Sequence, residues 1–93
     1  MVPPHSDEAE QSVLGALLID NMAFDTVADK LVPGSFYRSE HRTIYAAVAA
    51  LVTAGKPADV ITVFEALQVR GQSDDVGGLS YLNELAQDRK SVV

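Results

Sequence analysis

Apolar side chains recur every three or four residues in segment 40–54, and this helical repeat constrains the fold more than any other feature of the sequence. The side chains that share the repeat are those of His41, Ile44, Tyr45, Val48, Leu51 and Val52. This spacing is typical of one face of an amphipathic helix. Ser39 is a good N-cap, and Gly55 followed by Pro57 prevents the helix from continuing. The helix must therefore bury one face against other parts of the chain.

Four further segments show the same kind of repeat. The predicted helices run approximately over 7–19, 22–31, 63–70 and 79–87. Ser6 and Asp7 are both good N-caps, and Asp7 with Glu10 has the spacing of a capping box, as does Thr62 with Glu65. No segment alternates apolar and polar residues convincingly, as a strand would. The sequence predicts an all-α fold, a compact bundle of about five short helices.

The connections between these helices carry four specific expectations. Asp20-Asn21 should end the first helix and cap the second. Phe36 and Tyr37 should both fill the core where the chain turns, and 58–61 should be a short extended piece. Gly77-Gly78 precedes a helix and could present amides to an anion, but we expect only a turn and a helix start there.

Composition and length indicate one ordinary globular domain. Of the 93 residues, 47% are hydrophobic and 22% are charged, which is typical of a folded protein with a single core. We expect one domain over 1–93, with a globular part at about 6–87 and a tail at 88–93. Cysteine is absent, the start lacks a secretory pattern, and no apolar run approaches the roughly 18 residues that span a bilayer. We therefore expect a soluble, cytoplasmic protein that does not contact membranes.

The sequence lacks the residue patterns that catalysis or cofactor binding requires. Gly55-Lys56 has no upstream glycine and is followed by proline, so it is not a phosphate-binding loop. His5 and His41 lie in different segments without the spacing of a metal site. We expect His41 to be partly buried and hydrogen-bonded to a backbone group. No catalytic, cofactor-binding or metal-binding residues are predicted.

The charge distribution disfavours nucleic acid and favours protein as the partner. Thirteen acids and seven bases give a net charge of −6, and the bases are scattered except for Arg89-Lys90, so the surface should repel phosphates. The helix at 40–54 offers only Arg42 for base contacts, which is too few for a recognition helix. Met22, Tyr37 and Tyr81 are candidate exposed contacts with partners, and core packing is an equal alternative for each.

Four blocks of residues occur in a recognisable order along the chain. They are Pro4-His5-Ser6-Asp7-Glu8-Ala9-Glu10-Gln11-Ser12-Val13-Leu14-Gly15, Phe36-Tyr37-Arg38-Ser39-Glu40-His41-Arg42-Thr43-Ile44-Tyr45, Asp59-Val60-Ile61-Thr62 and Val76-Gly77-Gly78-Leu79-Ser80-Tyr81-Leu82. Their order and spacing resemble the amino-terminal domain of bacterial replicative DNA helicases of the DnaB family. The resemblance covers residues 3–87, and four ordered blocks are far more specific than one motif.

The resemblance implies a role within a larger protein. That parent would be a hexameric, ATP-driven helicase that unwinds DNA at replication forks. Its amino-terminal domains would form a collar, a trimer of dimers, that binds primase, with a helicase loader as a further partner. ATP and magnesium would act in a carboxy-terminal RecA-like domain that this chain lacks. The chain also ends before the family's long helical hairpin, which puts collar assembly by the chain alone in doubt.

Two other functions are compatible with a small acidic helical domain. One is the helicase-binding domain of a primase, although the Pro-His-Ser block near residue 1 argues against a domain that would follow a long catalytic chain. The other is a small DNA-binding regulator, which salt-dependent binding to duplex DNA would support.

Overall fold

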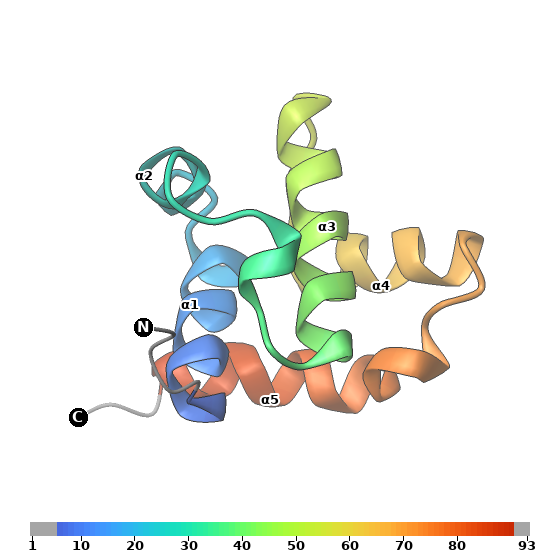
Figure 1. The fold of residues 1–93 in the computed structure, drawn as a ribbon. Helices are drawn as coiled ribbons and strands as arrows, with labels where there is room; N and C mark the ends of the chain where they lie inside the picture. The colour runs from blue at the N-terminus through green and yellow to red at the C-terminus, as the bar shows by residue number, and fades with distance from the viewer. Residues whose placement is uncertain (1–5, 91–93) are drawn as a thin grey trace.

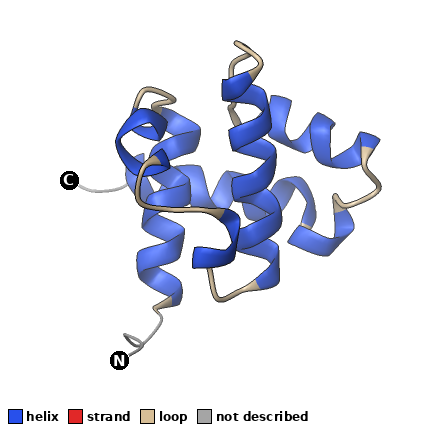
Figure 2. Cartoon of the chain, turned by 45° about the horizontal axis from the view of Figure 1, so that its top comes forward, coloured by secondary structure: helices blue, strands red, loops and turns tan. Residues whose placement is uncertain are grey.

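The structure is a computed structural model that describes residues 6–90, with side chains described for 6–87. The described part is entirely helical and contains no strand (Figure 1, Figure 2). Its elements are α1 (Asp7–Ile19), α2 (Ala23–Ala28), a 3₁₀ turn (Pro33–Ser35), α3 (Ser39–Thr53), α4 (Val60–Val69), a second 3₁₀ turn (Asp74–Val76) and α5 (Gly78–Lys90). None of these helices has the length and apolarity that crossing a membrane requires. The prediction of an all-α bundle of five helices is confirmed.

The core lies between α1, α3, α4 and α5. Figure 1 shows α5 across the base of the molecule, with α1 and α3 rising beside it. The most extensive contact joins α1 to α5; α3 packs against α1 and α4, and α4 packs against α5. The buried side chains that form the core are those of Leu14, Leu17, Leu18, Phe36, Ile44, Tyr45, Ala47, Val48, Ala58, Val63, Leu67, Val76, Leu82 and Leu85. Aliphatic side chains dominate this core, as the composition requires.

The repeat at 40–54 forms α3, and its two ends differ in how well they were predicted. Ser39 is the first helical residue rather than the N-cap, and Arg38 at the N-cap position makes no side-chain capping bond. At the other end Gly55 has a φ of +76°, and the amides of Gly55 and Lys56 donate to the carbonyls of Val52 and Leu51. This pattern is a Schellman motif, for which glycine is the favoured residue.

Two predicted capping boxes are wrong. In α1 the N-cap is Ser6, whose Oγ accepts a hydrogen bond from the Ala9 amide at 3.2 Å. The Glu10 side chain therefore lies one position beyond the box and is free to bond elsewhere. In α4 the helix begins at Val60, so the predicted extended piece at 58–61 is wrong for 60–61, although Asp59 is extended.

The capping box of α4 is built from Asp59 and Thr62. The Asp59 carboxylate accepts from the Thr62 amide at 2.9 Å, and the Thr62 hydroxyl accepts from the Asp59 amide at 2.8 Å. Asp and Thr are both favoured N-caps, so local preference did not distinguish Asp59 from Thr62.

Asn21 joins two connections of the chain instead of capping α2. Its Nδ2 donates to the carbonyls of Leu17 and Ala58, and its Oδ1 accepts from the Ala58 amide, at 2.9, 2.7 and 2.8 Å. The N-cap position of α2 is Met22, which has no side-chain capping bond. The Asn21 amide thus links the α1–α2 turn to the α3–α4 connection.

The prediction that two aromatics fill the core between α2 and α3 is right for one of them. Phe36 is buried and its ring lies 5.0 Å from the ring of Tyr45, centroid to centroid. Tyr37 is 62% exposed, because successive side chains of an extended segment point in opposite directions.

Helix α5 starts after a tight turn and extends past its predicted end. Gly77 and Gly78 both have positive φ, and a Cβ on Gly77 would lie 2.9 Å from the Cβ of Tyr81. The expected turn and helix start at Gly77-Gly78 are therefore observed. The helix continues to Lys90 rather than ending near Gln87, and 91–93 of the expected tail lie outside the described residues.

Candidate functional site

A chain of hydrogen-bonded side chains crosses the core from α1 through α3 to α5. His41 on α3 is fully buried. Its Nδ1 lies 2.7 Å from Oε1 of Glu10, and its Nε2 lies 2.6 Å from the hydroxyl of Tyr81. That hydroxyl also accepts a hydrogen bond from Nε2 of Gln11 at 3.2 Å. The prediction that His41 bonds to a backbone group, with only partial burial, is wrong.

Glu10 also fixes the segment that precedes α3. Its carboxylate accepts hydrogen bonds from the backbone amides of Tyr37 at 2.7 Å and Arg38 at 3.5 Å. Burial opposes ionisation of Glu10, but the hydrogen bonds from the Tyr37 amide, the His41 ring and the Arg38 amide outweigh it and lower the pKa of this carboxyl. Glu10 is therefore a carboxylate near neutral pH and can only accept hydrogen bonds.

An ionised Glu10 determines the direction of the remaining bonds. His41 must donate its Nδ1–H to the carboxylate, and in the neutral ring Nε2 is then an acceptor. The Tyr81 hydroxyl donates to this nitrogen, and burial raises the pKa of Tyr81, so the hydroxyl keeps its proton. Every polar atom of the His41 ring is satisfied in this arrangement, which explains how an imidazole occupies a fully buried position.

Arg38 lies at the edge of the same network and pairs with two acids. Its guanidinium donates to Asp7 at 3.0 Å and to Glu40 at 2.6 Å. The hydrogen bond from Arg38 is the main reason why the pKa of Glu40 falls to about 2. The bonds to Glu40 and Asp7 in turn raise the pKa of Arg38. These ion pairs hold the start of α3 against the start of α1.

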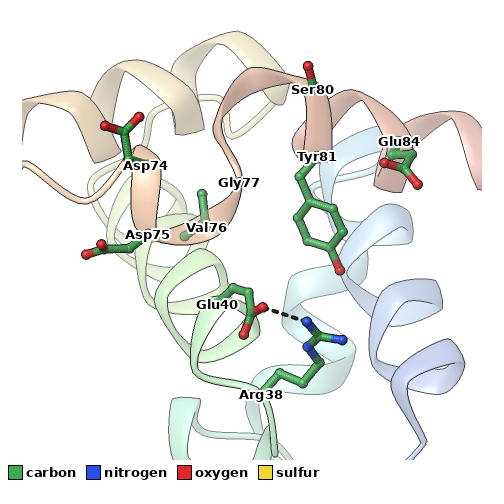
Figure 3. A pocket seen from close by; sticks show the side chains of 9 residues that line it. All are labelled: Arg38, Glu40, Asp74, Asp75, Val76, Gly77, Ser80, Tyr81 and Glu84. Carbon is green, nitrogen blue, oxygen red and sulfur yellow. Dashed lines mark hydrogen bonds and ion pairs between the residues drawn. The ribbon is translucent and has the colours of Figure 1, made fainter.

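An open cleft of about 460 Å³ lies beside Arg38 and Tyr81 (Figure 3). Figure 3 shows Asp74 and Asp75 on one side of it and Tyr81 on the other, with Glu40 bonded to Arg38 between them. The full lining comprises Arg38, Glu40, Asp74, Asp75, Val76, Gly77, Ser80, Tyr81 and Glu84. Four carboxylates against one guanidinium make the cleft unfavourable for phosphates.

His41 and Glu10 are committed to internal bonds, and within the described part of the chain no three or more His, Asp or Glu side chains are grouped so that they could hold a metal ion. His5 lies outside the described residues. The arrangement can hold helices together and present charged and apolar groups to a partner.

The three predicted partner contacts have different surroundings. Met22 is 78% exposed, and Tyr37 is also mainly exposed, with its backbone held on both sides. The Tyr37 amide donates to Glu10, and its carbonyl accepts from the guanidinium of Arg42 at 2.7 Å. Tyr81 is half-buried and its hydroxyl belongs to the network. Their roles as partner contacts stay predictions.

One signal in the sequence could have identified the network. Glu10 stands in helical register with the apolar stripe of α1, three and four residues before Val13 and Leu14. An acid on a buried face needs a polar partner, and on the apolar face of α3 only His41 and Tyr45 carry polar groups. The partner on α5 had no comparable signal, because tyrosine is common in cores.

Comparison with known proteins gives a consistent result. The family model described as the DnaB-like helicase N terminal domain matches residues 2–93. The replicative DNA helicase DnaB of Pasteurella multocida is 46% identical over 92 residues, which are 99% of this chain and 20% of that protein. The replicative DNA helicase DnaB of Geobacillus stearothermophilus is 42% identical over 85 residues, 91% of this chain and 19% of that protein. The chain thus spans about a fifth of the length of these relatives.

A solved structure is also closely similar. The N-terminal domain of the DnaB helicase from Mycobacterium tuberculosis superposes with a TM-score of 0.88 at 42% sequence identity. The match covers 92% of this chain and 60% of that one. The helical arrangement described above is therefore also that of a crystallised domain.

Proposed function

The chain belongs to the DnaB-like helicase N-terminal domain family, and on this basis we propose that it is the protein-interaction domain of a replicative DNA helicase. In this role it binds primase and contributes to assembly of the helicase ring as part of a collar. The observation that carries the proposal is the match over residues 2–93, together with relatives that are themselves replicative helicases. The relatives give no comparable support to a primase domain or a DNA-binding regulator.

The surface supports docking as the means by which the domain acts. Six large apolar side chains of the described residues are exposed, namely Ile19, Met22, Val32, Tyr37, Ile61 and Val69. Where such groups adjoin one another within a polar rim, they are typical of protein-binding surfaces. The net charge of −6 opposes contact with DNA phosphates.

The chemistry of unwinding is proposed to lie outside this chain. ATP and magnesium would bind in a separate carboxy-terminal part of the parent protein, and the domain itself would need neither. The parent would act in the cytoplasm, where the replication fork is, with a helicase loader as a further partner.

A deletion in the full-length helicase that contains this chain tests the proposal. The intact protein and a variant that lacks residues 1–93 are each mixed with primase from the same organism. Size-exclusion chromatography coupled to light scattering then reports ring mass and primase co-elution. We expect the deletion to abolish co-elution and to reduce the fraction of closed rings. A deletion variant that forms rings normally and retains primase would overturn the proposal.

A further inference from the structure

A second hollow lies on the surface where the end of α1, the start of α4 and the second half of α5 meet. It measures about 310 Å³ and is lined by Leu18, Ile19, Asp59, Val60, Ile61 and Ala86. Ile19 is 46% exposed and Ile61 is 56% exposed. Two of the six exposed large apolar side chains of the described residues thus lie at one hollow, although they come from different helices. Adjoining exposed aliphatic groups of this kind mark interaction sites.

Among the side chains that the structure describes, the charged groups at this hollow are negative. Asp59 lines it, and Asp20 directly follows Ile19 at the end of α1; both acids are exposed. The last turn of α1 contains no basic residue, so the partial negative charge at that helix end is not offset. Among the side chains that the structure describes, no lysine or arginine lines the hollow.

We propose that this hollow receives one helix of a partner protein, which inserts a leucine- or isoleucine-like side chain and places lysine or arginine beside it. The aliphatic lining favours insertion of an aliphatic side chain. The two acids and the carboxyl end of α1 favour positively charged residues on either side of it in the partner helix. This proposal rests on the docking function proposed above and assigns it a surface and a partner chemistry.

The same features argue against other occupants. A second copy of this chain would bring another acidic surface, with a net charge of −6, against this one. Nucleic acid and anionic lipid both carry phosphates, which Asp20 and Asp59 repel. A cationic, apolar helix is the occupant that satisfies both the lining and its charge.

Nuclear magnetic resonance of the isotopically labelled chain tests the assignment. The probe is a synthetic amphipathic helical peptide with a leucine face flanked by lysines, titrated into the 93-residue chain. We expect saturable shifts of the amides of Ile19, Val60, Ile61 and Ala86. A control peptide keeps the leucines and has glutamates in place of the lysines. It should bind at least about tenfold more weakly, because its negative charge has the same sign as the acids at the hollow.

Two substitutions on α4 provide a matched pair. Ile61→Lys should weaken binding of the lysine peptide at least about tenfold, because it removes apolar contact and adds a positive charge that repels the lysines of the peptide. Val69→Lys, at a position that is 88% exposed and lines another part of the surface, should leave affinity within about twofold of the unchanged chain. Each variant's amide spectrum verifies that it is folded.

Three results would overturn the proposal. They are equal binding of the lysine and glutamate peptides, shifts centred on the cleft of Figure 3 instead of the hollow, and equal loss of affinity in both variants. None of these results bears on whether the full-length helicase retains primase, so the two proposals fail separately.

Discussion

The substitution Tyr81→Phe removes one oxygen from the buried network and leaves the apolar contacts of the ring in place. In the native domain the hydroxyl of Tyr81 lies 2.6 Å from Nε2 of His41, and His41 is fully buried. The variant leaves this acceptor nitrogen without its hydrogen-bond partner. Leaving a buried polar group unsatisfied costs about 1–3 kcal/mol, so we expect the free energy of unfolding to fall by about 2 kcal/mol.

Urea unfolding followed by far-ultraviolet circular dichroism measures this loss. The midpoint should fall while the slope of the free energy against urea stays constant, because the substitution does not change the surface that unfolding exposes. In a domain of this size the same loss lowers Tm by roughly 8–16 °C. The ¹⁵N shifts of the His41 ring provide a local readout: Nδ1 should be protonated and Nε2 unprotonated, and Tyr81→Phe should move the Nε2 resonance most.

The variant Tyr45→Phe is a matched control. It removes a hydroxyl that donates to the carbonyl of Leu31 at 2.8 Å; Tyr45 is buried, whereas Leu31 is only partly buried. Water can hydrate that carbonyl when the hydroxyl is gone, so we expect a loss of about 1 kcal/mol or less. If Tyr81→Phe costs under about 0.5 kcal/mol, or if Nε2 carries the ring proton, the assigned direction of the network is wrong.

Three further outcomes follow from contacts elsewhere. Asn21→Ala removes two hydrogen bonds with Ala58 and one to the carbonyl of Leu17 and should cost about 2–3 kcal/mol in urea unfolding; a loss below about 1 kcal/mol would contradict the linking role. Asp59→Ala removes the N-cap of α4 and should cost about 1 kcal/mol, whereas unchanged stability would show that the cap contributes little. The pKa of Glu40 is lowered from 4.5 to about 2 by Arg38. The contribution of ionised Glu40 to the free energy of unfolding is therefore present above pH 4.5 and is lost as pH falls toward 2. Glu40→Gln should reduce the loss of stability on acidification, and an unchanged profile of unfolding free energy against pH would refute the pairing.

Helix positions were predictable because apolar periodicity is a local signal. The stripe of α3 and the glycine that ends it lie within one short segment, and both were identified correctly. Helix starts were less predictable, since Asp59 and Thr62 are similarly good N-caps and the choice between them depends on where Ala58 is buried. Ala58 is buried and is hydrogen-bonded to Asn21, which lies 37 residues away.

The complete network was not predictable from local patterns, although Glu10 and His41 both stand on apolar helix faces. Glu10 and Tyr81 lie 31 and 40 residues from His41, and no repeat within one helix relates them. Periodicity placed Glu10 and His41 on buried faces, but it could not say that the packing of α5 would bring Tyr81 to them. The same limit applies to Phe36 and Tyr37, since periodicity does not decide which side of an extended segment faces the core.

Binding of the isolated chain to the helicase-binding domain of primase tests most directly whether this domain acts by docking. Isothermal titration calorimetry with the two purified proteins from one organism should give saturable heat, without added ATP, magnesium or DNA. Absence of binding at protein concentrations of about 1 mM, where even interactions worth only about 4 kcal/mol are populated, would contradict the proposed function.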